Sequence, residues 1–128
     1  LIDLDCEIWV PAARPDVFTA ANAHEVRAKV IAQGANIPAT VEAEAIFHER
    51  GITVLPDFIA NAGGVICGAV EYGGGTEREA FASIEEKIRA NTREVLELSV
   101  AANVAPRVAA TEMARARVLE MMGYRRSF

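Results

Sequence analysis

Three short apolar runs, each interrupted by a proline or a glycine, constrain the fold of this chain more than any other feature. They cover residues 6–13, 28–36 and 52–57, with breaks at Pro11, Gly34 and Pro56. The runs are rich in valine and isoleucine and lack apolar–polar alternation, which is typical of strands buried on both faces of a parallel sheet. Helix-like stretches separate them. This order is that of right-handed βαβ units, so the sequence predicts an α/β fold with about three parallel strands.

The stretches between the runs differ in how clearly they indicate a helix. Residues 22–28 allow about two helical turns at 3.6 residues per turn. Residues 40–51 are clearer, because Thr40 is a good N-cap and Gly51 suits the position just after a helix. Glu42 and Glu44 favour the positive end of the helix dipole. We therefore expect a well-defined second helix, with His48 on its surface in an ion pair with Glu44.

The pattern changes to long helices at Thr76. Thr76 and Glu79 form a capping box, and apolar residues then recur at helical spacing to about Asn103. Pro106 fits the first turn of another helix, which Gly123 is expected to close. Two helices joined by so short a turn should pack as an antiparallel pair. Three glycines, at 73–75, separate the α/β part, residues 1–75, from this helical part, residues 76–128.

Composition excludes several classes of protein. The net charge is −5, and basic residues cluster only at Arg125 and Arg126, so we expect no nucleic-acid or membrane partner. The longest apolar run, 58–70, is shorter than the roughly 20 residues of a membrane helix. The two cysteines, Cys6 and Cys67, are expected to be buried free thiols in a reducing, cytoplasmic compartment. The histidines lack metal-ligand spacing, so no metal is expected.

The residues that follow each run are candidates for a binding site. In open α/β sheets, ligands bind beyond the carboxyl ends of the strands, which here are residues 11–13, 34–36 and 61–64. Small residues let a flat ligand approach, and asparagine offers a donor and an acceptor that match a carboxamide such as that of nicotinamide. The same residues are also ordinary turn formers, so the pattern leaves both interpretations open. The apolar stretch 65–70 is expected to be a pocket wall and a buried helix.

Three motifs in this order resemble a known family. They are Pro11-Ala12-Ala13, Gly34-Ala35-Asn36 with Pro38-Ala39-Thr40 behind it, and Asn61-Ala62-Gly63-Gly64-Val65. Together they resemble the C-terminal part of the glutamate/leucine/phenylalanine/valine dehydrogenases, and most closely the glutamate dehydrogenase branch. The closing segment RVAATEMARARV is also similar, so the resemblance covers essentially the whole chain. It implies a partial Rossmann fold: residues 1–75 would be the second half of an NAD(P)-binding domain, and residues 76–128 its C-terminal helices.

The resemblance also implies where the cofactor, NAD or NADP, would lie. Ala12 and Ala13 would line the nicotinamide-ribose side of the cofactor site. Gly34 and Asn36 would lie near the nicotinamide nucleotide. Asn61 would face both the nicotinamide carboxamide and the amino-acid substrate.

The same resemblance implies an amino-acid pocket. Asn61, Gly64, Val65 and Gly68 would form it, with Val65 touching the substrate side chain. Glutamate dehydrogenases commonly carry a serine at the position of Gly68. Its replacement removes a hydroxyl from the expected pocket and keeps another amino acid open as the substrate.

The implied activity is the reversible, NAD(P)-dependent oxidative deamination of an L-amino acid to a 2-oxo acid and ammonia. The family's glycine-rich pyrophosphate loop and its catalytic lysine and aspartate match nothing in this sequence, so we assign no catalytic residue. We therefore expect a fragment that is inactive alone. Its expected partners are the remainder of its own chain, the amino acid and further copies in a homo-oligomer, and its cut surface should self-associate.

Two other readings stay open. The chain could be a helical interaction or dimerisation module that binds no nucleotide. It could also belong to another nicotinamide-dependent Rossmann protein such as a malic enzyme, although the GAN and NAGGV motifs together disfavour this. A glycine-rich βα turn upstream in the same reading frame would distinguish the first alternative from a dehydrogenase.

Overall fold

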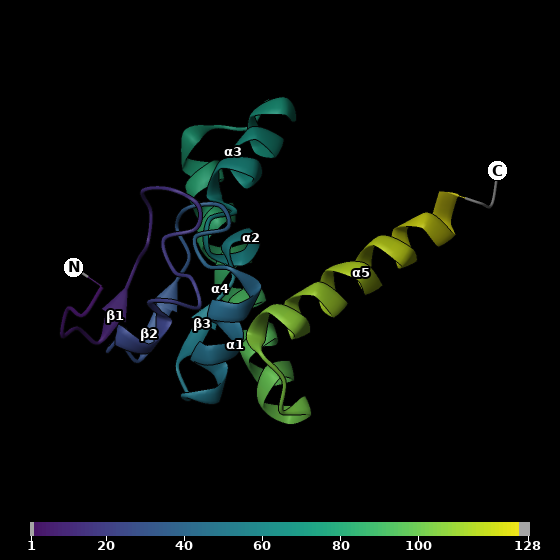
Figure 1. The fold of residues 1–128 in the computed structure, drawn as a ribbon. Coiled ribbons are helices and arrows are strands. Elements are labelled where there is room, and N and C mark those ends of the chain that lie inside the picture. Colours follow the sequence, from purple (N-terminus) through teal and green to yellow (C-terminus); the bar gives the residue numbers. More distant parts are fainter. Residues whose placement is uncertain (1, 126–128) are drawn as a thin grey trace.

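A three-stranded parallel sheet confirms the predicted α/β class in the computed structural model, which describes residues 2–125. The strands β1 (Ile8–Trp9), β2 (Val30–Ala32) and β3 (Thr53–Leu55) lie in the order β1-β2-β3 (Figure 1). Ile31 is in register with Trp9 on one side and with Val54 on the other. The strands are shorter than the predicted runs because each run contains a turn residue beyond which the ladder does not continue.

Of the two connections between strands, the first differs from the predicted helix and the second agrees with it. The first contains a single 3-10 turn, η1 (Ala23–Glu25), where about two helical turns were expected, because Val26 already has extended backbone. The second contains α1 (Val41–Glu49), and the Thr40 hydroxyl accepts a hydrogen bond from Ala43 N at 3.3 Å. Gly51 has a φ of 73°, as expected of the residue that ends such a helix. The predicted caps of this helix are confirmed.

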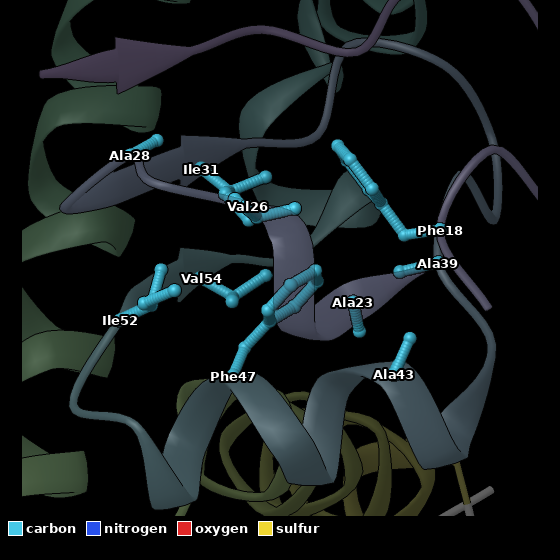
Figure 2. Close-up of a cluster of buried hydrophobic side chains, with 10 residues drawn as sticks. All are labelled: Phe18, Ala23, Val26, Ala28, Ile31, Ala39, Ala43, Phe47, Ile52 and Val54. Carbon is cyan, nitrogen blue, oxygen red and sulfur yellow. The ribbon is translucent and has the colours of Figure 1, made fainter. Parts of the chain in front are cut away.

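The main core lies between α1 and the sheet. Figure 2 shows Phe47 and Ala43 of α1 facing Ile31 of β2 and Val54 of β3. Phe18 completes this layer with edge-to-face contacts, its ring centroid 5.4 Å from Phe47 and 5.5 Å from Trp9. Such aromatic pairs add to the free energy gained by burying their area. The ten buried residues of this core are Phe18, Ala23, Val26, Ala28, Ile31, Ala39, Ala43, Phe47, Ile52 and Val54.

Four helices follow β3. They are α2 (Asp57–Ala60), α3 (Gly63–Tyr72), α4 (Glu77–Ala102) and α5 (Pro106–Arg125). The capping box is confirmed, because the backbone N of Thr76 donates to Glu79 Oε2 at 2.6 Å while its hydroxyl accepts from Glu79 N. Helix α4 ends at Ala102 with Asn103 as its C-cap, which agrees with the predicted end at about Asn103. The predicted end of α5 at Gly123 is wrong: this glycine lacks the positive φ of a helix-ending residue, and the helix continues to Arg125.

Helices α4 and α5 form the predicted antiparallel pair. Ser99 Oγ donates to Val104 O at 2.6 Å across the turn, and Arg117 reaches back to Glu94 Oε2 at 2.6 Å. Beyond this ion pair, α5 extends away from the rest of the molecule (Figure 1). A second buried cluster joins α2, α4 and α5 to Leu55 of β3. Since Leu55 and Val54 point to opposite faces of the strand, β3 separates the two cores.

The structure also bears on the predictions about the cysteines and about membrane-spanning helices. Cys6 and Cys67 are both free thiols, as predicted, but each is half-buried rather than buried. Within residues 2–125, no helix combines the length and hydropathy needed to cross a membrane.

Candidate functional site

The three motif loops meet at the carboxyl end of the sheet. Ala35 N donates to Pro11 O at 2.8 Å, which joins the first loop to the second. The side-chain nitrogen of Asn61 donates to Asn36 Oδ1 at 2.8 Å and to Gly34 O at 3.3 Å, which joins the third loop to the second. The parallel sheet therefore places the predicted cofactor-binding residues side by side, although they lie up to about 50 positions apart in the sequence.

Gly34 makes the close approach of the first two loops possible. A Cβ at this position would lie 3.1 Å from Ala12 Cβ and 3.3 Å from Val10 Cγ1. Ala12 and Ala13 are themselves exposed, so they form a small, open surface beside Gly34. A flat ligand could rest against this surface without meeting a long side chain.

Asn36 and Asn61 together present one donor and one acceptor. The mutual hydrogen bond uses the oxygen of Asn36 and the nitrogen of Asn61. Within residues 2–125, no protein group bonds the side-chain nitrogen of Asn36 or the side-chain oxygen of Asn61. A primary carboxamide has the complementary pair, an acceptor oxygen and a donor nitrogen. The arrangement is chemically suited to binding such a group.

Three of the predicted substrate residues lie along one face of α3, and the fourth, Asn61, lies two residues before the helix. Asn61, Gly64, Val65 and Gly68 follow at helical spacing. Val65 is 80% exposed, and a Cβ at Gly64 or Gly68 would meet nothing within 4 Å. The expectation that residues 65–70 form a buried helix is wrong, because α3 contains no buried residue. Its other side packs against α4, where a Cβ at Gly63 would lie 3.7 Å from Ile84 Cγ2.

The sequence analysis missed a buried polar cluster beneath this edge. Arg107 of α5 donates from Nε to Glu44 Oε2 at 2.6 Å, and from Nη2 to Gln33 Oε1 at 2.7 Å and to Asp57 Oδ1 at 3.0 Å. Gln33 Nε2 donates to the other oxygen of Glu44 at 2.8 Å. Its own oxygen also accepts from Asp57 N at 3.1 Å. These four side chains link the residue that follows β2 with α1, α2 and α5.

The cluster holds its charges in place. Burial alone would raise the pKa of Asp57, but the hydrogen bond from Ile37 N and the charge of Arg107 together hold that pKa below its usual value. Burial would likewise lower the pKa of Arg107, but Glu44 and Asp57 raise it overall. Throughout the described part of the chain, every buried side-chain nitrogen and oxygen has a hydrogen-bond partner. Removing one member would therefore leave a buried charge without its partner.

One signal for this cluster was present in the sequence. Glu44 stands next to Ala43 and three residues before Phe47, so it shares the buried side of α1. The predicted surface ion pair between Glu44 and His48 is wrong, because both oxygens of Glu44 are engaged by Gln33 and Arg107. His48 is exposed, as expected. Arg107 carried no local signal, since its partners lie 50 or more residues away.

No group of three potential metal ligands comes together among residues 2–125. The candidate site is thus an open edge of small residues and two side-chain amides. The charged cluster of Arg107, Glu44 and Asp57 lies next to it.

Comparison with known proteins gives the relatives of this chain. The family model of glutamate/leucine/phenylalanine/valine dehydrogenases matches residues 1–126. An NAD-specific glutamate dehydrogenase from Staphylococcus aureus is 37% identical over 131 residues, covering 98% of this chain and 32% of the relative. An NADP-specific glutamate dehydrogenase from Saccharolobus shibatae is 49% identical over 72 residues, covering 56% of this chain and 17% of the relative.

A solved structure gives the same result for the fold. The crystal structure of L-tryptophan dehydrogenase from Nostoc punctiforme matches with a TM-score of 0.84 and 26% identity, covering 93% of this chain and 36% of that protein. The chain thus spans between 17% and 36% of the length of these three proteins. Since the family model matches nearly every residue, the chain belongs to the glutamate/leucine/phenylalanine/valine dehydrogenase family.

Proposed function

We propose that this chain is the nicotinamide-binding end of the cofactor domain in an NAD(P)-dependent amino-acid dehydrogenase. The observation that carries the proposal is the Asn36–Asn61 pair, whose bond of 2.8 Å leaves one amide donor and one amide acceptor available at the carboxyl end of the sheet. These two groups complement the carboxamide of nicotinamide. Ala12, Ala13 and Gly34 supply the open surface beside them, on which the ring and its ribose would rest.

The cofactor when bound would accept a hydride from the α-carbon of the amino acid, or return it to the imine in the reverse direction. The residues of this chain would position the nicotinamide ring and would not take part in the chemical step. Asn61 would orient the carboxamide, and the small residues would keep the ring close to the substrate. The acid–base residues of the deamination would come from the rest of the protein, because the alanines, glycines, asparagines and valine of the proposed site have no ionisable side chain.

The amino acid would bind along the exposed face of α3. Gly64, Val65 and Gly68 project from that face next to Asn61, and Val65 offers an apolar contact. The absence of a hydroxyl at Gly68 removes a donor for a polar substrate group. Relatives of this chain are glutamate dehydrogenases, and a tryptophan dehydrogenase shares its fold, so we propose an L-amino acid as substrate without restricting its side chain.

The named relatives include NAD-specific and NADP-specific enzymes, so we propose NAD or NADP as the cofactor. We also propose that this chain acts within a longer protein, with a substrate domain and the first half of the Rossmann fold as its neighbours, and that the whole protein forms a homo-oligomer. The two unpaired thiols support a reducing and therefore cytoplasmic location.

The test is the reduction of NAD or NADP by the full-length protein with a panel of L-amino acids, followed through absorbance of the reduced cofactor. We expect turnover with at least one amino acid and no turnover by the 128-residue chain alone. Asn61→Ala should lower kcat/KM by about a hundredfold, because it removes the amide that orients the ring. Asn91→Ala is the matched control, since Asn91 bonds only Arg117 on an exposed helix surface. Absence of turnover with every amino acid would contradict the proposal.

One observation favours a second function, that of a helical interaction module. The distal part of α5 leaves Val118, Leu119, Met121 and Met122 exposed. Such a surface is typical of a contact with another protein segment. Sedimentation of the chain over a range of concentrations tests it: self-association that Leu119→Glu abolishes, without any effect of NADH or NADPH, would favour this reading.

A further inference from the structure

The loop that carries Asn36 continues into an unusual backbone conformation. Ile37 has a φ of 50°, in the left-handed region that β-branched residues rarely adopt. Burial of its side chain does not explain this, because Ile37 is 59% exposed. Something other than packing must therefore hold the backbone at this position.

Hydrogen bonds on both sides of Ile37 provide that hold. Its backbone N–H donates to Asp57 Oδ2 at 2.9 Å. Its carbonyl accepts from Asp16 N at 3.0 Å, and the next residue, Pro38, is buried. Phe18 N then donates to Pro38 O at 2.9 Å. Of these partners, only Asp57 acts through a side chain, so its bond to Ile37 depends on what else that side chain contacts.

Asp57 is in turn held by the C-terminal helices. Its other oxygen accepts from Arg107 Nη2 at 3.0 Å, and its backbone N–H donates to Gln33, which Arg107 also contacts. Arg107 is the second residue of α5, and the second core fixes that helix against α4. A continuous series of contacts therefore runs from the α4–α5 pair through Arg107, Asp57 and Ile37 to Asn36.

We propose that Arg107 is a positioning residue for the cofactor site. Acting through Asp57, it keeps Ile37 in the left-handed conformation, and this conformation points Asn36 toward Asn61. The packing of the C-terminal helical pair thus controls how well the two amides are placed to bind nicotinamide. The inference rests on the proposed function for its ligand, but the coupling between Arg107 and Ile37 can be measured without any ligand.

The first measurement is hydrogen exchange of the Ile37 amide in the full-length protein, followed by mass spectrometry at single-residue resolution. Arg107→Gln should speed exchange at Ile37 by about tenfold more than at Ile52, the reference amide, which bonds Phe47 O at the other end of the sheet. Arg117→Gln is the matched control on the same helix, where the lost partners are exposed. If Arg107→Gln does not fold, Arg107→Lys takes its place with the same expectation. Equal changes at Ile37 and Ile52 would overturn the coupling.

The second measurement is the dissociation constant of NADH and NADPH for the full-length protein. Arg107→Gln should weaken binding by about tenfold, and adding Ile37→Gly should restore most of the affinity, because glycine adopts the left-handed conformation without help from Asp57. A purely structural role of Arg107 predicts no such rescue, so its absence would overturn the inference. A wild-type protein that binds neither nucleotide would contradict the proposed function, while the exchange measurement would still decide the coupling.

Discussion

Residues 2–56, which contain the sheet and α1, and the helices α2–α5 that follow them bury their apolar side chains to different extents. In the first, Phe18, Phe47 and Ile31 are fully buried around α1. In the second, Val65, Tyr72 and Phe81 are 80%, 97% and 65% exposed. The first part closes its own core, whereas the helices keep apolar faces open. The candidate site lies where the two parts meet, so its small residues have the sheet on one side and the open face of α3 on the other.

The two parts are joined by a partly buried network of ion pairs in addition to apolar packing. Arg107 of α5 reaches Glu44 of α1 and Asp57 of α2. Buried ion pairs of this kind favour one arrangement of their elements because any other would leave charges without partners. We therefore expect these polar contacts, together with the second core, to hold the helical pair in place against the sheet.

The largest expected effect compares two phenylalanines. Phe47→Ala removes a fully buried ring and should lower the free energy of unfolding by about 3–5 kcal/mol. Phe81→Ala removes a ring that is largely exposed and should change it by less than about 0.5 kcal/mol. Urea denaturation of both variants measures the difference. Similar losses for the two would show that the helical part buries Phe81 in solution, against the contrast drawn above.

A smaller effect is expected from the network that joins the two parts. Because the folded-state pKa of Asp57 lies below its reference value of 3.8, the unfolded state binds more protons between the two values. The stabilisation by Asp57 is therefore fully present above pH 3.8 and is lost as the pH falls through the folded-state pKa. Urea midpoints at pH 5 and at about pH 3 should differ less in Asp57→Asn than in the wild type.

The matched control for this pH dependence is Glu85→Gln. Glu85 is exposed and pairs with Arg89 within α4, a kind of pair that contributes little to stability. Its substitution should keep the wild-type dependence on pH. If Asp57→Asn also kept it, the carboxylate would not be held as the structure indicates.

The smallest effect concerns the open face of α3. Gly68→Ser meets no neighbour within 4 Å and replaces a poor helix former, so it should stabilise the protein by about 0.5 kcal/mol. Gly75→Ser should instead destabilise it, because its Cβ would clash with Val70 Cγ1. Thermal denaturation of the two variants checks the signs. Destabilisation by Gly68→Ser would mean that this face is covered.

Local signals in the sequence predicted the secondary structure well. Thr40, Thr76 and Pro106 each begin a helix where their capping chemistry predicts one, because such signals act within a few residues. The predicted helix end at Gly123 was wrong because a glycine of this kind ends a helix where its φ is positive, and the φ of Gly123 is not. The exposure of α3 was not predictable, because an apolar segment does not reveal whether its neighbours cover it.

The convergence of the candidate site residues was predictable from the sequence, but the hydrogen bonds between them were not. Parallel strands bring their carboxyl ends to one edge, so the convergence of Ala12, Asn36 and Asn61 followed from the order of the strands. Their hydrogen bonding depends on loop conformations, such as the left-handed Ile37, that propensity does not specify. The contact between Arg107 and Asp57 could not be predicted, because residues 50 positions apart show no characteristic spacing in the sequence.

The most direct test of the account compares NADH with its 3-acetylpyridine analogue, in which a methyl group replaces the carboxamide nitrogen. If Asn61 accepts a hydrogen bond from that nitrogen, Asn61→Ala in the full-length protein should weaken NADH binding by about tenfold. The same substitution should barely affect binding of the analogue, which has no donor to lose. With NADPH as cofactor, the corresponding phosphate-bearing analogue serves. An equal loss for both nucleotides, or none for either, would contradict a nicotinamide site at Asn36 and Asn61.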